Sequence, residues 1–84
     1  MDFKVDFAVY GALTQDGGKS EVKDVTKVLM DMLNRGEATI PINNKTFGDP
    51  APGHGKHFGA IVHRDGTPYR YACKEDQTID FAAN

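Results

Sequence analysis

The sequence predicts an α+β fold, a two-layer sandwich in which one amphipathic helix packs on a four- to five-stranded mixed or antiparallel sheet. Three observations support this prediction. Apolar residues alternate with a period of two in several short segments, as they do in half-buried strands. Only residues 25–33 have the period of an amphipathic helix. At 84 residues, the chain suits a single small domain, residues 1–84, with one modest core.

The first predicted strand covers residues 2–10 and ends at Gly11. Strict alternation predicts one face with Phe3, Val5, Phe7 and Val9, and another with Asp2, Lys4, Asp6, Ala8 and Tyr10. Residues 14–20 follow this strand. The segment Asp16-Gly17-Gly18 within them predicts a mobile loop, because these residue types favour turns.

The predicted helix is defined by apolar residues at i, i+3, i+4, i+7 and i+8, namely Val25, Val28, Leu29, Met32 and Leu33. Such a stripe faces a core along one side of a helix. Asp24 or Thr26 is the expected N-cap. Gly36 is expected to end the helix as a C′ glycine.

Four further strands are predicted after the helix. The first covers residues 38–42, and because Pro41 has no backbone N–H to donate, this strand should lie at a sheet edge or carry a bulge. Residues 58–62 and 69–73 alternate on either side of Asp65-Gly66, a pair that suits a tight hairpin turn. Residues 79–81 form a short last strand, followed by a frayed tail at residues 82–84.

One helix can cover only one face of the predicted sheet, so the other face should be partly exposed. The candidates for an interaction surface or a homodimer contact there are Tyr10, Ile61, Tyr69 and Tyr71. Any one of them alone is more often an isolated apolar residue on the surface.

Composition and charge exclude several classes of protein. The net charge of −2 argues against a general nucleic-acid binder. No apolar run approaches the roughly 20 residues that cross a bilayer. The acidic, alternating N-terminus is unlike a signal peptide, and the single Cys73 allows no internal disulfide. We therefore expect a cytoplasmic protein with no nucleic-acid polymer and no membrane among its partners.

Residues 47–58 are the strongest functional signal in the sequence. They contain five glycines or prolines, two histidines and a lysine, so the backbone is neither helix nor strand and yet has a restricted shape. Residues 43–71 carry a net charge of +2 whereas the rest carries −4, and all three histidines lie in the positive part. A rigid loop with local positive charge predicts a site for a small anionic ligand.

The predicted ligand is phosphate-bearing or nucleotide-like, and the loop at residues 43–57 would hold it. Lysines and histidines would supply charge, asparagines would read hydrogen-bonding edges, and arginines of the following hairpin would close the site. The candidate ligand-binding residues are Asn43, Asn44, Lys45, Asp49, Gly53, His54, Gly55, Lys56, His57, Arg64 and Arg70.

Three alternatives to simple binding are nucleotide hydrolysis, metal binding and nucleophilic catalysis by a cysteine. Gly53-His54-Gly55-Lys56 is not a nucleotide-hydrolysing P-loop, because Pro50 and His57 replace the required glycine and hydroxyl residue and a strand follows. A metal could be held only where His54, His57 and Asp49 meet, and paired histidines in such a loop are more often solvated. Cys73 reads as a small buried thiol rather than a nucleophile. We expect no enzymatic activity, no metal and no cofactor.

Several segments resemble a domain of unknown function at the C-terminus of mitochondrial DnaJ-type co-chaperones and its stand-alone microbial relatives. The likeness runs from about Val22 to Phe81 and rests on the following segments: Asp24-Val25-Thr26, Ile40-Pro41-Ile42-Asn43-Asn44, Phe47–Gly53 with Lys56, the hairpin at Asp65-Gly66, and Thr78-Ile79-Asp80-Phe81. The resemblance implies an accessory, non-catalytic module and names no catalytic residue. The chain has no J-domain, so co-chaperone activity and a mitochondrial location are not implied.

Two functional hypotheses follow from the sequence. In the first, the loop at residues 43–57 binds and sequesters a small anionic ligand, with a homo-oligomer interface as one place where this could occur. In the second, the domain is an accessory module that docks a protein partner through its exposed sheet face or a strand edge.

Overall fold

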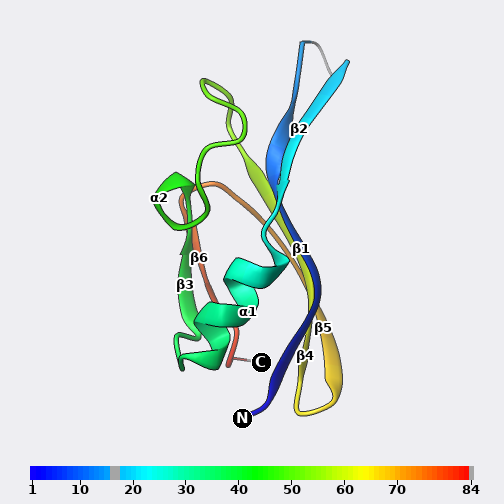
Figure 1. Cartoon of the computed structure of the whole chain (residues 1–84), viewed down its shortest axis with the longest axis vertical. Helices are drawn as coiled ribbons and strands as arrows, with labels where there is room; N and C mark the ends of the chain where they lie inside the picture. The colour runs from blue at the N-terminus through cyan, green and yellow to red at the C-terminus, as the bar shows by residue number, and fades with distance from the viewer. Residues whose placement is uncertain (16–17, 84) are drawn as a thin grey trace.

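The computed structural model describes residues 1–15 and 18–83, and its larger sheet has four antiparallel strands in the order β2-β1-β4-β5 (Figure 1). The bounds of these strands are Phe3–Thr14 for β1, Lys19–Asp24 for β2, His57–Arg64 for β4 and Thr67–Lys74 for β5. Alternating apolar residues on β1, β4 and β5 build this sheet, as the sequence predicts.

The second layer combines helices with a separate small sheet. It consists of α1 (Thr26–Asn34), α2 (Asn44–Phe47), and an antiparallel pair made by β3 (Thr39–Ile42) and β6 (Gln77–Asp80). Figure 1 shows all four elements on the same side of the four-stranded sheet. We call the side of that sheet facing them the inner face, and the opposite side the outer face. The predicted two-layer α+β sandwich is therefore confirmed.

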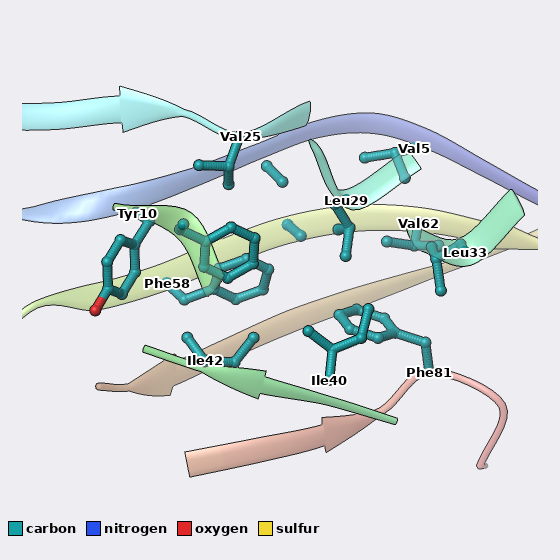
Figure 2. Close-up of a cluster of buried hydrophobic side chains, with 13 residues drawn as sticks. Val5, Tyr10, Val25, Leu29, Leu33, Ile40, Ile42, Phe58, Val62 and Phe81 are labelled. Carbon is teal, nitrogen blue, oxygen red and sulfur yellow. The ribbon is translucent and has the colours of Figure 1, made fainter. Parts of the chain in front are cut away.

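The hydrophobic core lies between the two layers (Figure 2). Its aromatic rings form a chain in which Tyr10, Phe47, Phe58 and Phe81 follow one another at centroid distances of 5.4, 5.6 and 6.4 Å. Rings at such distances contribute packing beyond their buried area. The core residues are Val5, Ala8, Tyr10, Val25, Leu29, Leu33, Ile40, Ile42, Phe47, Phe58, Ala60, Val62 and Phe81.

The predicted faces of the first strand are wrong beyond Val5. The pairing of β1 with β4 shifts register between Val5 and Phe7, and an irregularity of this kind reverses which residues point inward. Val5, Ala8 and Tyr10 are buried whereas Phe7 is exposed. Tyr10 is therefore a core residue and not part of an exposed surface.

The predicted loop at residues 14–20 is wrong at its two ends, whereas Gln15 and Gly18 form a turn. β1 continues to Thr14, and β2 begins at Lys19; Asp16 and Gly17 of the predicted loop lie outside the described residues. The segment Lys19–Asp24 contains one apolar residue, Val22, so it has no apolar alternation. Its strand conformation comes from pairing with β1.

Neither predicted N-cap residue acts as a side-chain cap of α1. Val25 holds the N-cap position without a side-chain bond, while the Asp24 carboxylate accepts the N–H of Thr26. The Thr26 hydroxyl instead accepts the N–H of Ala8, and the Val25 N–H donates to the Ala8 carbonyl. The start of α1 thus takes over hydrogen bonding to β1 beyond the last residue of β2.

The predicted end of α1 at Gly36 is confirmed. Gly36 has a φ of +87°, its N–H donates to the Leu33 carbonyl, and the next N–H, of Glu37, donates to the Met32 carbonyl. This is the Schellman arrangement, in which a residue at positive φ reverses the chain, and glycine adopts that conformation at least cost.

The last predicted strand belongs to a different sheet from the one expected. β6 pairs with β3 rather than extending the four-stranded sheet, and every strand pair is antiparallel rather than mixed. β3 has β6 as its one partner among the described strands, so Pro41 lies in an edge strand, as predicted. Past β6, the Ala82 N–H donates to Asp80 and the Ala83 carbonyl accepts from Arg64; Asn84 lies outside the described residues.

Candidate functional site

The predicted binding loop is a short helix followed by an irregular segment. Asn43 caps α2 by accepting the Thr46 N–H, so the expectation of a continuous loop over residues 43–57 is wrong for its first part. Residues 53–57 and the turn at residues 74–76 together border an open hollow of about 600 Å³. Seven of the candidate ligand-binding residues line it, namely Asn44, Asp49, Gly53, His54, Gly55, Lys56 and His57.

Lys56 crosslinks this loop from inside. Its side chain is only 3% exposed, and the ammonium lies 2.9 Å from an Asp49 carboxylate oxygen and 3.6 Å from one of Glu75. The ammonium also donates to the Ala51 carbonyl at 3.2 Å. The hydrogen bond with Asp49 and the two nearby carboxylates raise the pKa of Lys56, even though burial opposes this. The charge predicted to bind a ligand is compensated within the fold.

The remaining side chains of the hollow carry both signs of charge. Its two lysines, Lys56 and Lys74, face three carboxylates, those of Asp49, Glu75 and Asp76. The exposed His54 and His57 would add positive charge when protonated. With its histidines neutral, the hollow is therefore not a cationic site.

The two candidate arginines lie away from the hollow. Arg64 is buried at the far end of the eight-residue strand β4, about 20 Å along the strand from His57. Its guanidinium donates to the carbonyls of Phe81 and Ala83 and stacks over the Tyr69 ring at 4.3 Å. Arg70 is exposed on β5, and Lys45 is exposed on α2. Neither arginine closes the loop in the way that was predicted.

Cys73 and Asn44 are both held by their surroundings in the fold. Cys73 is half-buried, and burial raises the pKa of its thiol, which disfavours the nucleophilic thiolate. The side-chain oxygen of Asn44 accepts a hydrogen bond from the Tyr10 hydroxyl at 2.7 Å. Across residues 1–15 and 18–83, no three His, Cys, Asp or Glu side chains converge as metal ligands. In the same part of the chain, no helix has the length and apolarity needed to span a membrane.

The outer face of the four-stranded sheet is a second candidate site. Phe7 lies opposite Ile61, Val9 opposite Gly59, and Gly11 opposite Val22. Three large apolar side chains of this face are well exposed: Phe7 at 44%, Leu13 at 65% and Val22 at 48%. The second layer, formed by α1, α2, β3 and β6, lies on the inner face of the sheet (Figure 1).

A shallow groove of about 310 Å³ runs across this face, where β1, β2 and β4 meet. Val9, Leu13 and Val22 border it, and the glycines Gly11 and Gly59 leave its middle without side chains. Gly11 is required by close backbone approach, because a Cβ there would collide with the Glu21 carbonyl oxygen and the Val22 Cα. A Cβ on Gly59 would make only ordinary contacts.

The outer face has a cationic rim along β5. Arg70 lies opposite Ile61, and Lys74 lies opposite His57; within the described residues neither cation forms an ion pair. The carboxylates of this face lie on other strands: Asp6 on β1 contacts His63 at 2.9 Å, and Asp24 on β2 accepts the Thr26 N–H, which leaves its negative charge in place. The face thus has an apolar centre with Arg70 and Lys74 along its β5 edge, and Lys74 also lines the hollow beside Glu75 and Asp76.

Sequence reasoning found this face only in part. Ile61 lies on the outer face as predicted, but Tyr69 and Tyr71 point inward, where Arg64 covers Tyr69 and the Phe81 ring contacts Tyr71 at 4.7 Å. Phe7, Val9, Leu13 and Val22 were missed. Alternation on β1 predicted the first two to be core residues, and nothing in the sequence marks the register shift that turns them outward.

Comparisons with protein-family models, with curated proteins and with solved structures found no match. The likeness to the C-terminal domain of DnaJ-type co-chaperones accordingly rests on the sequence segments quoted for it.

Proposed function

We propose that this domain is a protein-interaction module that docks a partner chain on the outer face of its four-stranded sheet. The observation that carries this proposal is the exposure of Phe7, Leu13 and Val22 on one uncovered face, where Leu13 and Val22 border a groove. Contiguous exposed apolar patches are uncommon on soluble domains and mark interaction surfaces.

Adjacency, rather than exposure of single residues, distinguishes this face. A lone exposed valine or phenylalanine on a strand needs no explanation, since such residues favour strands. Here Phe7 faces Ile61 across the strands, and Val9 follows two residues later on the same face. Covering these side chains would gain about 25 cal/mol for each Å² of apolar surface removed from water.

The proposal can be tested with a displayed random peptide library. The wild type should enrich peptides that a Phe7→Ser/Ile61→Ser double variant does not retain. A Thr78→Ser variant, changed on an exposed residue of β6, serves as the control and should retain them. Circular dichroism checks that each variant is folded. Enriched peptides that bind the double variant as well as the wild type would rule out this surface.

A second candidate function is the binding of a small phosphate-bearing ligand in the hollow beside residues 53–57. It is favoured by one observation, the convergence of seven predicted residues around an open hollow whose loop is fixed by Lys56. Both histidines are exposed at its rim, where a ring N–H of each can donate to a bound anion.

Calorimetric titration with inorganic phosphate and with ATP tests this candidate. The affinity should weaken with added salt and fall in the His54→Ala/His57→Ala double variant. Binding that is indifferent to salt and to both histidines would exclude the hollow as the site.

A further inference from the structure

We infer that the partner docked on the outer face is an amphipathic helix with acidic residues along one side of its apolar stripe. This inference rests on the proposed function and adds the chemistry of the partner. It is drawn from the length of the apolar row, the groove, and the position of the cationic rim.

The apolar row on β1 has a length that suits a helix. Phe7, Val9 and Leu13 lie on the outer face of one strand, and the six residue steps from Phe7 to Leu13 correspond to about 20 Å at 3.3 Å per residue. A helix of about 13 residues spans the same distance at 1.5 Å per residue. Its apolar side chains at i, i+4, i+7 and i+11 would meet this row along most of its length.

The groove provides a receptor for one of these side chains. In the pairing of β1 with β4, Gly59 lies opposite Val9 and Gly11 lies opposite His57, so the two glycines are diagonal neighbours. The middle of the face is therefore recessed, with Val22 and Leu13 on one side and β4 on the other. A recess of about 310 Å³ takes an inserted apolar side chain, whereas a lipid surface is bound by side chains that protrude. The concave shape therefore favours a protein partner over a membrane.

The rim fixes the charge of the partner. Arg70 and Lys74 lie on the β5 side, next to the apolar centre, and no described carboxylate pairs with them. A helix laid along β1 and β4 would place one of its flanks against this rim, and Glu or Asp there would be attracted. A second copy of the face carries its carboxylates, Asp6 and Asp24, on two separate strands rather than as one acidic row.

The test uses two synthetic helical peptides with the same leucine stripe. One carries Glu and the other Lys at the positions flanking that stripe, and binding to the intact chain is followed by fluorescence anisotropy. The Glu peptide should bind about tenfold tighter than the Lys peptide at low salt, and the difference should shrink as salt is raised. Equal binding of both peptides, or no binding of the Glu peptide, would overturn the inference.

Three variants locate the effect on the molecule. Arg70→Glu/Lys74→Glu should reverse the preference toward the Lys peptide, whereas Lys45→Glu, a charge reversal on α2, should change neither affinity. Gly59→Val should weaken binding by filling the recess, with the melting temperature as a check on folding. If the Arg70→Glu/Lys74→Glu variant still binds the Glu peptide more tightly than the Lys peptide, the peptide does not contact the cationic rim.

The alternative occupants have their own signatures, each of which overturns the inference. Anionic vesicles that bind the wild type but not the rim variant, with no peptide binding, would indicate a membrane surface. A concentration-dependent dimer that Phe7→Ser abolishes would indicate a second copy. Phe7-dependent library peptides that are not acidic would leave the proposed function standing while this inference falls. If the Phe7→Ser/Ile61→Ser variant retains every enriched peptide, the proposed function itself falls.

Discussion

The two faces of the four-stranded sheet are built from the same strands and both carry large apolar residues, but they differ in what covers them. On the inner face, Val5, Ala60 and Val62 are buried beneath α1 and the β3–β6 pair. On the outer face, Phe7 and Ile61 lie side by side with no described element above them. Apolar residues used in folding stabilise the domain, whereas those left over are available for binding.

The largest expected contrast is between two phenylalanines on opposite faces. Phe58 is 3% exposed on the inner face, so Phe58→Ala should cost about 3–5 kcal/mol, a large share of the stability of so small a domain. Phe7→Ala should cost less than about 1 kcal/mol, because its ring is already partly in water. Urea denaturation measures both. Equal losses would mean that the outer face is covered in solution.

A second contrast separates the two glycines of the outer face. Gly11→Ala should destabilise the domain by roughly 1–3 kcal/mol, because the backbone of β2 must move away from the new methyl group. Gly59→Ala should change stability by less than about 0.5 kcal/mol, since its Cβ would lie 3.9 Å from the nearest atom outside its chain neighbours. Thermal unfolding followed by circular dichroism compares the pair. A tolerated Gly11→Ala would show that β2 is not held tightly against β1.

Acid should loosen the loop that Lys56 holds in place beside the hollow. The hydrogen bond from Lys56 holds the pKa of the Asp49 carboxyl below its usual range. A carboxyl of this kind stabilises the fold above its unfolded pKa of about 4, and the contribution is lost as the pH falls through the lower, folded pKa. Asp49→Asn should therefore lose less stability than the wild type between about pH 6 and pH 2.5.

Denaturation curves across this range test the acid prediction. Asp76→Asn, changed in the same hollow, is the matched control and should follow the wild type. If Asp49→Asn also follows the wild type, the ion pair with Lys56 contributes nothing to the folded state.

The smallest expected effect concerns Tyr10 on the inner face. Burial, followed by nearby carboxylates, raises the pKa of its hydroxyl to about 12. A raised pKa contributes stability that is full below the unfolded value of about 10 and is lost as the pH rises through 12. The decrease in melting temperature from about pH 8 to about pH 11 should be smaller in Tyr10→Phe than in the wild type. Tyr69→Phe is the control, and a parallel fall in all three proteins would contradict burial of the Tyr10 hydroxyl.

Local patterns in the sequence predicted much of the fold. The apolar stripe at Val25, Leu29 and Leu33 identified α1, and Gly36 identified its end, because both depend on residues within a few positions of one another. The hairpin at Asp65-Gly66 followed from a two-residue turn with positive φ at both positions. The sequence did not predict β2, because six largely polar residues form a strand only where a partner strand supplies the hydrogen bonds.

The candidate site shows the same division. The loop near residues 53–57 was predicted from its glycines, prolines and histidines, and it does border a hollow. The role of Lys56 was not predictable, because Glu75 lies 19 positions away and Ala51 and Asp49 are brought beneath it only by the folded loop. The outer face was predicted to exist, but its residues were mostly misassigned.

By itself, the sequence determined the period of each segment, the turn positions and the α+β class, since these arise from contacts between residues close along the chain. Only the tertiary structure decided which side of β1 faces the core, which sheet β6 joins and where the charge of Lys56 is compensated. The physical reason is that a single register shift between Val5 and Phe7, set by pairing with a strand more than 50 residues away, exchanges inside and outside for the rest of the strand.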